Sequence, residues 1–203
     1  MREMAIGTFL DRLASADPTP GGGTASALAG AMAAALAAMV ARLSTGKGGG
    51  DAAFARVIET ADRVRGALLT LAAEDAQAFD AVMQAMRLPR ATEEQKRARQ
   101  AAVQATLPRA AEVPLRVMEE TLRVLRLLPD LARTGNPNAV SDVAVSALLG
   151  EAAVHGALHN VQINAAAIRD HTLAAGLRGD ADALGREAAH LRDAALGAVR
   201  ERR

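Results

Sequence analysis

The chain has 203 residues, half of them hydrophobic, and its 24 basic and 23 acidic side chains give a net charge of +1. This length predicts a single globular domain, residues 1–203, with a core large enough to fold without disulfides. The absence of cysteine and the presence of only three aromatic residues exclude thiolate metal sites, cysteine nucleophiles and stacking platforms for single-stranded nucleic acid.

The distribution of charged and apolar residues also predicts where the protein acts and which partners it binds. Acidic and basic residues are mixed along the chain, so no electrostatic footprint for nucleic acid is present. The N-terminal segment carries acidic residues and lacks the apolar run of a signal peptide. The apolar stretch 25–40 is short and alanine-rich for a membrane span. We therefore expect a cytoplasmic protein that binds neither nucleic acid nor membranes.

Helical periodicity covers nearly the whole chain. The first predicted helix, 4–16, ends before two prolines. A glycine triplet opens the second helix, 21–43, with Thr24 as its cap or a first-turn residue. Asp51 is the predicted N-cap of a long third helix, 51–88, which ends at a proline.

The fourth predicted helix begins after a capping box that starts at Thr92. Its interior contains Pro108 and Pro114, and a proline removes a backbone donor and clashes with the preceding turn. The sequence therefore predicts a kink or a break at these positions.

The last third of the chain contains a predicted turn at 135–138 and a helix over 139–175. Gly179 and Asp180 then separate a final helix that ends near Val199. Together the segments predict an all-α protein, a bundle of long helices in one domain.

An acidic residue interrupts the apolar stripe of the third helix. The stripe consists of Val64, Leu68, Leu71, Phe79, Val82 and Met86. Asp75 lies at its centre, with Leu71 four residues before it and Phe79 four after it. A carboxylate there needs a partner or has a raised pKa. It is either a structural group that caps another helix or pairs with an arginine, or a general acid/base in a pocket.

The glycine triplet, 21–23, precedes an apolar helix and allows positive φ angles. It leaves backbone N–H groups at a helix N-terminus, where anions bind. The alternative is a tightly packed entry turn without a ligand.

The helix 139–175 is rich in amides for so apolar a segment. Asp142, Asn160 and Asn164 project within about 40° of one another on the helical wheel. Residues 142 and 160 are nevertheless about 27 Å apart along a straight helix. They either line a long ligand or serve opposite ends of a symmetric assembly, and hydrogen bonding between helices is the structural alternative.

Glu151, His155 and His159 recur at four-residue spacing on one helical face and form a candidate zinc site. They lack the His-Glu-x-x-His pattern. A solvated stripe in which Glu151 pairs with His155 is the favoured interpretation.

Taken together, several short motifs resemble the cyclodeaminase/cyclohydrolase family of folate enzymes. The motifs are Pro20-Gly21-Gly22-Gly23-Thr24, Asp75-Ala76-Gln77-Ala78-Phe79, Arg87-Leu88-Pro89, Thr92-Glu93-Glu94, Val113-Pro114-Leu115, Asn136 with Ser141-Asp142, Glu151, and Gly156-Ala157 with Asn160-Val161-Gln162-Ile163-Asn164. They cover most of the chain, and their order and spacing make the resemblance specific.

The resemblance implies an all-helical homodimer with a folate pocket associated with the subunit interface. It implies no metal and no cofactor beyond the tetrahydrofolate substrate. Asp75 is the implied catalytic acid, the same residue that the helical wheel singles out. The candidate substrate-binding residues are Gly22, Gly23, Thr24, Arg87, Asp142, Asn160 and Asn164, with Arg87 placed to pair the glutamyl carboxylate.

Two reactions fit the resemblance. The first is the cyclodeaminase reaction, which converts 5-formimidoyltetrahydrofolate to 5,10-methenyltetrahydrofolate with release of ammonia and needs a separate enzyme to supply the formimidoyl group. The alternative is the cyclohydrolase reaction, which converts 5,10-methenyltetrahydrofolate to 10-formyltetrahydrofolate. A helical ligand-binding or interaction module is the non-enzymatic alternative. The alanine- and glycine-rich face of 25–41 independently favours dimerisation, because it needs a surface to cover it.

Overall fold

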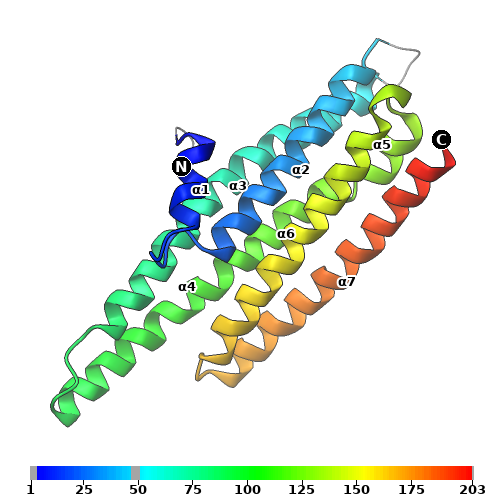
Figure 1. Ribbon diagram of the computed structural model, residues 1–203. Coiled ribbons are helices and arrows are strands. Elements are labelled where there is room, and N and C mark those ends of the chain that lie inside the picture. Colours follow the sequence, from blue (N-terminus) through cyan, green and yellow to red (C-terminus); the bar gives the residue numbers. More distant parts are fainter. Residues whose placement is uncertain (1–3, 47–50, 203) are drawn as a thin grey trace.

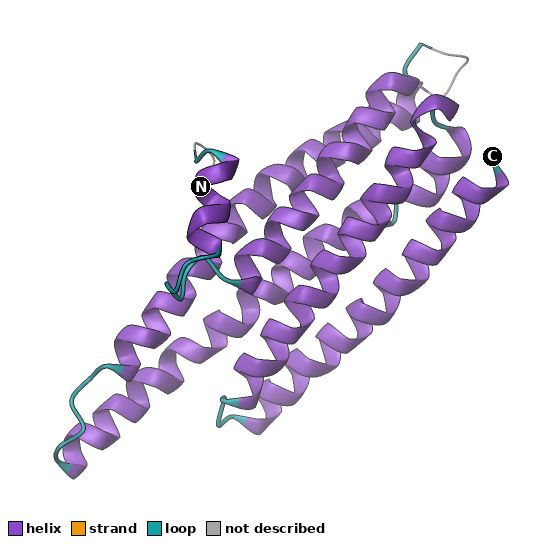
Figure 2. Cartoon of the chain, in the orientation of Figure 1, coloured by secondary structure: helices purple, strands orange, loops and turns teal. Residues whose placement is uncertain are grey.

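The computed structural model describes residues 4–46 and 51–202, and all regular elements within these ranges are helices (Figure 2). The helices are α1 (Ile6–Leu13), α2 (Gly22–Ser44), α3 (Asp51–Met86), α4 (Glu93–Leu125), α5 (Leu128–Thr134), the 3-10 helix η1 (Pro137–Ala139), α6 (Val140–Ala166) and α7 (His171–Glu201). The predicted all-α class is thus confirmed.

Helix α2 lies between α3 and α6 and packs chiefly against these two helices (Figure 1). Helix α4 contacts both α3 and α6, while α7 packs on the outer side of α6. Helix α3 has 36 residues and α2 has 23. As a result, α3 and α4 extend beyond the other long helices as a hairpin at one end of the molecule.

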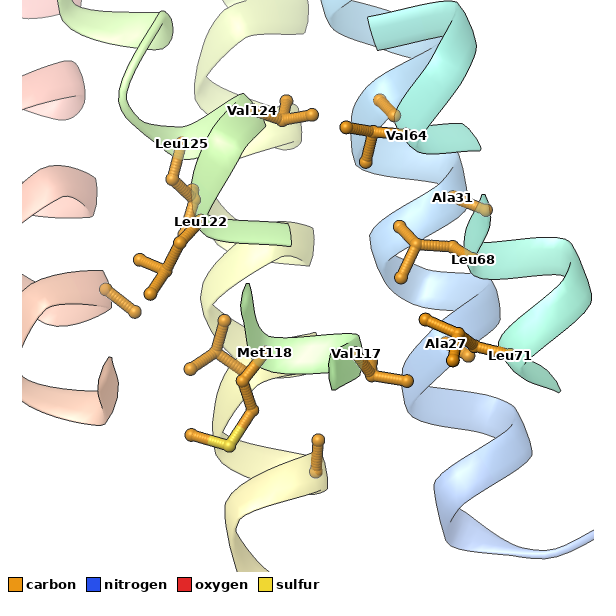
Figure 3. Close-up of a cluster of buried hydrophobic side chains, with 14 of the residues drawn as sticks. Ala27, Ala31, Val64, Leu68, Leu71, Val117, Met118, Leu122, Val124 and Leu125 are labelled. Atoms are coloured by element: carbon orange, nitrogen blue, oxygen red, sulfur yellow. The ribbon is translucent and has the colours of Figure 1, made fainter. Parts of the chain in front are cut away.

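The core is built from small residues on α2 and larger ones on its neighbours. Figure 3 shows Ala27 and Ala31 of α2 beside Leu68 and Leu71 of α3. All four are buried. Gly30 lies on the same helix, and a Cβ built on it would come within 2.6 Å of the Thr121 hydroxyl oxygen on α4. The alanine and glycine content of α2 therefore lets three helices approach it closely.

By length and composition alone, α2 could cross a membrane, with a mean hydropathy of 1.8 over its most apolar window. In the bundle, however, most of that window is buried against other helices. Packing in the core thus accounts for the apolar character of the buried face of α2.

Helix α4 continues without interruption through Pro108 and Pro114, so of the predicted kink or break, the break is wrong. Pro114 has no N–H to donate to the carbonyl of Ala110, four residues earlier. The Asn164 side chain on α6 supplies the missing donor, with Nδ2 at 2.7 Å from the Ala110 oxygen. A contact between helices thus compensates for one of the two prolines.

The boundary between the last two helices also differs from the prediction. Helix α6 ends at Ala166 instead of near residue 175, and Gly179 and Asp180 lie inside α7. The Asp170 side chain starts α7 by accepting hydrogen bonds from the N–H groups of Thr172 and Leu173, both at 3.0 Å. An aspartate N-cap therefore outweighs the glycine signal farther along the chain.

Candidate active site

A cavity of about 370 Å³ opens beside the first turn of α2 and runs along the α3–α4 hairpin. Its walls come from the turn before α2, from α3 and α4, and from the end of α6. The polar lining residues include Gly22, Gly23, Asp75, Asn160 and Asn164, and the apolar ones include Phe79, Val82, Met83, Met86, Leu107 and Ile163. The cavity is thus polar near α2 and apolar toward the hairpin.

The Asp75 side chain extends from α3 to the first turn of α2. The Thr24 hydroxyl donates a hydrogen bond to Asp75 Oδ2 at 3.0 Å and lies 3.4 Å from the backbone oxygen of Ala72. A Cβ built on Gly23 would lie only 2.2 Å from Asp75 Oδ1. The carboxylate therefore occupies the space that any side chain at position 23 would need.

Burial raises the pKa of the Asp75 carboxyl above its ordinary value, because desolvation disfavours the charged form. The hydroxyl and the backbone N–H of Thr24 donate hydrogen bonds to the carboxylate and lower the pKa, but by less. Asp75 thus bonds to the first turn of α2, as the structural interpretation predicts, and it also lines the cavity, where a general acid/base would have to lie. A half-buried carboxyl facing a cavity is suited to exchanging a proton with a ligand.

The glycine triplet forms the tightly packed entry turn that was one of its two predicted roles, and it does so without a positive φ. Among the described glycines only Gly46 has a positive φ. Gly21 is the N-cap of α2, with an extended backbone. Glycine is required at position 23 because the Asp75 carboxylate is so close. At Gly22 an added Cβ would have its nearest neighbour, the Asn160 Nδ2, at 3.8 Å.

Thr24 is a first-turn residue of α2, one of its two predicted positions, and it is not placed to touch a ligand. It lies inside the helix with none of its surface exposed, and its hydroxyl points at Asp75. The predicted contact between Thr24 and the substrate is therefore corrected: Thr24 positions the carboxyl that faces the cavity.

Asn160 and Asn164 both line the cavity, one turn apart on α6. The Asn160 Nδ2 donates to the Gly156 oxygen of its own helix at 2.9 Å. The Asn164 Nδ2 is already engaged by the Ala110 oxygen on α4. Each side chain leaves its Oδ1 without a hydrogen-bond partner among the described residues, so both can still accept a hydrogen bond from a ligand.

Arg87 and Asp142 are not brought to this cavity. Arg87 is exposed just past the end of α3, and it is absent from the cavity walls. Asp142 is in the first turn of α6, at the end of that helix remote from Asn160. Within one chain, neither residue is placed to contact a ligand bound beside Asp75.

The candidate zinc residues do not converge either. The Glu151 carboxylate accepts an ion pair from Arg192 at 3.0 Å, whereas the His155 Nε2 is 4.0 Å away from it. The His159 side chain is exposed. The described part of the chain contains no group of three or more His, Asp or Glu residues that could hold a metal ion.

Sequence reasoning missed the apolar wall of the cavity. The sequence predicts one apolar stripe on α3, and in the structure this stripe leaves the core and enters the cavity wall at Asp75. Leu68 and Leu71, before Asp75, are buried in the core, whereas Phe79 and Met86, after it, are 38% and 43% exposed and line the cavity together with the buried Val82. The length of α3 could have predicted this wall. Because α3 is longer than α2, its apolar face continues beyond the core.

The chain is similar to known proteins over most of its length. The family model for formiminotransferase-cyclodeaminase matches residues 5–183. A methenyltetrahydrofolate cyclohydrolase of Methylorubrum extorquens is 40% identical over 172 residues, which are 83% of this chain and 83% of that protein. The formimidoyltransferase-cyclodeaminase of Sus scrofa is 36% identical over 84% of this chain, but the match spans only 32% of that protein.

The fold has a close counterpart among solved structures. The crystal structure of formiminotetrahydrofolate cyclodeaminase from Thermotoga maritima matches with a TM-score of 0.88 and 30% sequence identity, covering 98% of both chains. The family resemblance seen in the sequence is thereby confirmed. The chain belongs to the formiminotransferase-cyclodeaminase family of folate one-carbon enzymes.

Proposed function

We propose that this protein is a methenyltetrahydrofolate cyclohydrolase that uses Asp75 as its proton-transfer group. The observation that carries the proposal is a half-buried carboxyl with a raised pKa, held by Thr24 at the polar end of an otherwise apolar cavity. The 40% identity to a protein of that name, over most of both chains, favours the cyclohydrolase reaction.

In this reaction water adds to the carbon that bridges N5 and N10 of the cationic substrate. The Asp75 carboxylate accepts a proton from the attacking water and, by its charge, stabilises the cation as it is bound. The tetrahedral carbon then breaks its bond to N5, which takes a proton as it leaves. The product is 10-formyltetrahydrofolate, and the second proton of the water is released to solvent.

The remaining lining residues bind and orient the substrate. The free Oδ1 atoms of Asn160 and Asn164 accept hydrogen bonds from N–H groups of the pterin ring, and the backbone around Gly22 and Gly23 borders the same polar end. Phe79 is the one aromatic side chain in the wall and packs against the planar part of the substrate. No cofactor other than the folate takes part.

The cyclodeaminase reaction is the second candidate, and the structural match to the Thermotoga maritima cyclodeaminase favours it. In this reaction N10 attacks the formimidoyl carbon on N5, and ammonia leaves once it has been protonated. The same carboxyl at the same carbon would deliver that proton. A separate formimidoyl-transferring enzyme would then supply the substrate.

We further propose that the protein acts in the cytoplasm as a homodimer. Large apolar side chains are exposed on two neighbouring helices, α2 and α6. They are Met32, Met39 and Leu43 on α2, and Val145 and Leu148 on α6. A second copy of the chain would cover this face. Light scattering at micromolar concentration should give twice the chain mass of 21.0 kDa, and a monomer would contradict the proposal.

Parallel assays of the purified protein test the function. The loss of methenyltetrahydrofolate absorbance measures the cyclohydrolase reaction, and its gain from 5-formimidoyltetrahydrofolate measures the cyclodeaminase reaction. We expect the first to be the faster. Faster turnover of the formimidoyl substrate would make the protein a cyclodeaminase. Folate binding without turnover of either compound would instead favour a ligand-binding module. Loss of activity on addition of a chelator would favour the candidate metal site at Glu151, His155 and His159.

A further inference from the structure

Gly156 lies where the backbone of α6 contacts α2. A Cβ built on Gly156 would overlap the Oγ of Ser26 and would lie 3.4 Å from the Ser26 Cβ. Ser26 is buried, and its hydroxyl donates a hydrogen bond to the Gly22 oxygen at 2.8 Å. The hydroxyl can therefore turn away from α6 only by giving up this bond. Position 156 has no room for a side chain as long as the two helices keep their present separation.

Two contacts fix α6 against α2, which lies beside it (Figure 1). In the middle of α2 the Ser146 hydroxyl donates to the Ala33 oxygen at 2.8 Å. Nearer the cavity, Gly156 meets Ser26. From there α6 continues for one turn to Asn160, which lines the cavity. The contact at Gly156 is thus the nearer of the two to the site, and it sets how close the cavity end of α6 lies to α2.

The polar groups of the cavity are attached to different helices at this end. Asp75 of α3 is held by the hydroxyl of Thr24 on α2, at 3.0 Å. The Asn160 Nδ2 is held by the Gly156 oxygen of α6, at 2.9 Å. A shift of α6 away from α2 would therefore carry Asn160 with it and leave Asp75 in place.

We propose that Gly156 is a positioning residue: by letting α6 lie directly against Ser26, it sets the separation between Asn160 and Asp75 that the substrate spans. This inference rests on the proposed function, since it takes Asn160 to accept a hydrogen bond from the folate while Asp75 exchanges the proton. Gly156 and Ser26 are both absent from the cavity walls, so they act only through the groups that line them.

The first test is kcat/KM for methenyltetrahydrofolate in Gly156→Ala, measured well below the melting temperature of the variant. The new Cβ needs about 1 Å more space, and a displacement of that size lowers kcat/KM about 10²-fold. In the double variant, Ser26→Ala with Gly156→Ala, the overlapping oxygen is gone and the Cβ at position 26 is an ordinary 3.4 Å away. We expect its kcat/KM to return to within about threefold of Ser26→Ala alone.

A double-mutant cycle separates positioning from a general loss of packing. Because the shift acts through Asn160, adding Gly156→Ala to Asn160→Ala should lower kcat/KM by less than about twofold more.

The matched control is Gly150→Ala on the same helix, where a Cβ would lie 2.7 Å from the Leu125 Cδ2 in the core. Gly150 is ten residues before Asn160, which corresponds to about 15 Å along the helix. Gly150→Ala should lower the melting temperature and keep kcat/KM within about threefold of wild type.

The outcomes distinguish this inference from the proposed function. If the wild type turns over methenyltetrahydrofolate, the positioning role is overturned by wild-type kcat/KM in Gly156→Ala, by no rescue from Ser26→Ala, by a full further loss in the Asn160→Ala background, or by an equal loss in Gly150→Ala.

If the wild type turns over neither candidate substrate, the proposed function fails, and calorimetry with folic acid decides the inference by itself. Weaker binding to Gly156→Ala that is restored in the double variant with Ser26→Ala would support the positioning role. Equal dissociation constants for wild type and Gly156→Ala, or no binding to the wild type, would overturn it.

Discussion

Helix α2 meets a polar cluster at each of its ends, and the two clusters differ in what they leave available. At its C-terminal end the Asn136 side chain donates from Nδ2 to the Leu43 oxygen at 3.1 Å and accepts at Oδ1 from the Asn138 N–H at 3.1 Å. The Asn136 backbone N–H donates to the Ser44 hydroxyl at 2.7 Å. These groups are neutral, and the Asn136 side chain finds both of its partners within the protein.

At the N-terminal end of α2 the cluster is ionisable and open. Asp75 takes its hydrogen bonds from a single residue, Thr24, and lines a cavity. Both Asn136 and Asp75 belong to the motifs that resemble the folate enzymes, yet their surroundings assign them different roles. The closed cluster fastens the segment before α6 to the end of α2, whereas the open one holds the ionisable group that we propose takes part in the reaction.

The largest loss of activity is expected for Asp75→Asn, which removes the ionisable group of the open cluster. The amide keeps the size of the side chain and can still accept from Thr24, but it cannot carry the proton. We expect kcat for methenyltetrahydrofolate to fall by a factor of about 10² to 10⁴. Near-wild-type turnover of both candidate substrates would contradict the assignment.

Asp75→Asn should also change how the stability of the protein depends on pH. Because the pKa of Asp75 is raised in the folded protein, the wild type loses stability as the pH rises through that pKa. Asp75→Asn removes this dependence, so its melting temperature relative to wild type should increase from acid to neutral pH. A variant that simply misfolds would melt lower at every pH.

Gly23→Ala should disturb the open cluster by displacement alone. The new Cβ would lie 2.2 Å from Asp75 Oδ1, so the carboxylate must move. A displacement of about 1 Å is expected to lower kcat about 10²-fold. The matched control is Gly179→Ala within α7, where an added Cβ has no neighbour within 4 Å and kcat should stay within a few-fold of wild type. Equal effects of the two substitutions would contradict a role for the close approach.

These residues also show how far the sequence alone could predict the site. The sequence predicts the site of Asp75, because helical periodicity alone places this acid within an apolar stripe. The fate of Pro114 could not be predicted, because it depends on Asn164, fifty residues away in the chain, reaching the carbonyl that the proline leaves unpaired. The need for glycine at position 23 could not be predicted either, because it comes from the Asp75 side chain on another helix.

The arginines near the end of α3 show a second limit of what the sequence alone can predict. Arg87 belongs to a motif that resembles the folate enzymes, but its position at a helix end does not determine where its side chain points. Arg90 and Arg97 line a second cavity, at the tip of the α3–α4 hairpin, because the chain turns back on itself between α3 and α4. Periodicity within a helix predicts faces well, whereas the choice among arginines in and beyond a loop depends on tertiary structure.

Asn136→Ala should have the opposite profile to Asp75→Asn. It removes the side-chain hydrogen bonds to Leu43 and Asn138 at a largely buried position. We expect the free energy of unfolding to fall by about 1 to 3 kcal/mol, measured by urea denaturation. Because the cluster is at the end of α2 remote from Asp75, kcat should change less than about twofold under conditions in which the variant is folded. A large loss of kcat would show that the closed end also takes part in the reaction.

The smallest and most specific effect is predicted for the hydroxyl of Thr24. Its hydrogen bond lowers the pKa of Asp75, so the nearly isosteric Thr24→Val should raise that pKa. The reactive form is the carboxylate, which is lost as the pH falls through the pKa. The acidic limb of the kcat profile, corrected for the uncatalysed rate, should therefore move to higher pH in Thr24→Val and stay in place in Thr24→Ser, which keeps the hydroxyl. A purely structural role for Thr24 would lower kcat at every pH without moving the limb, so an unmoved limb in Thr24→Val would separate Thr24 from the proton transfer.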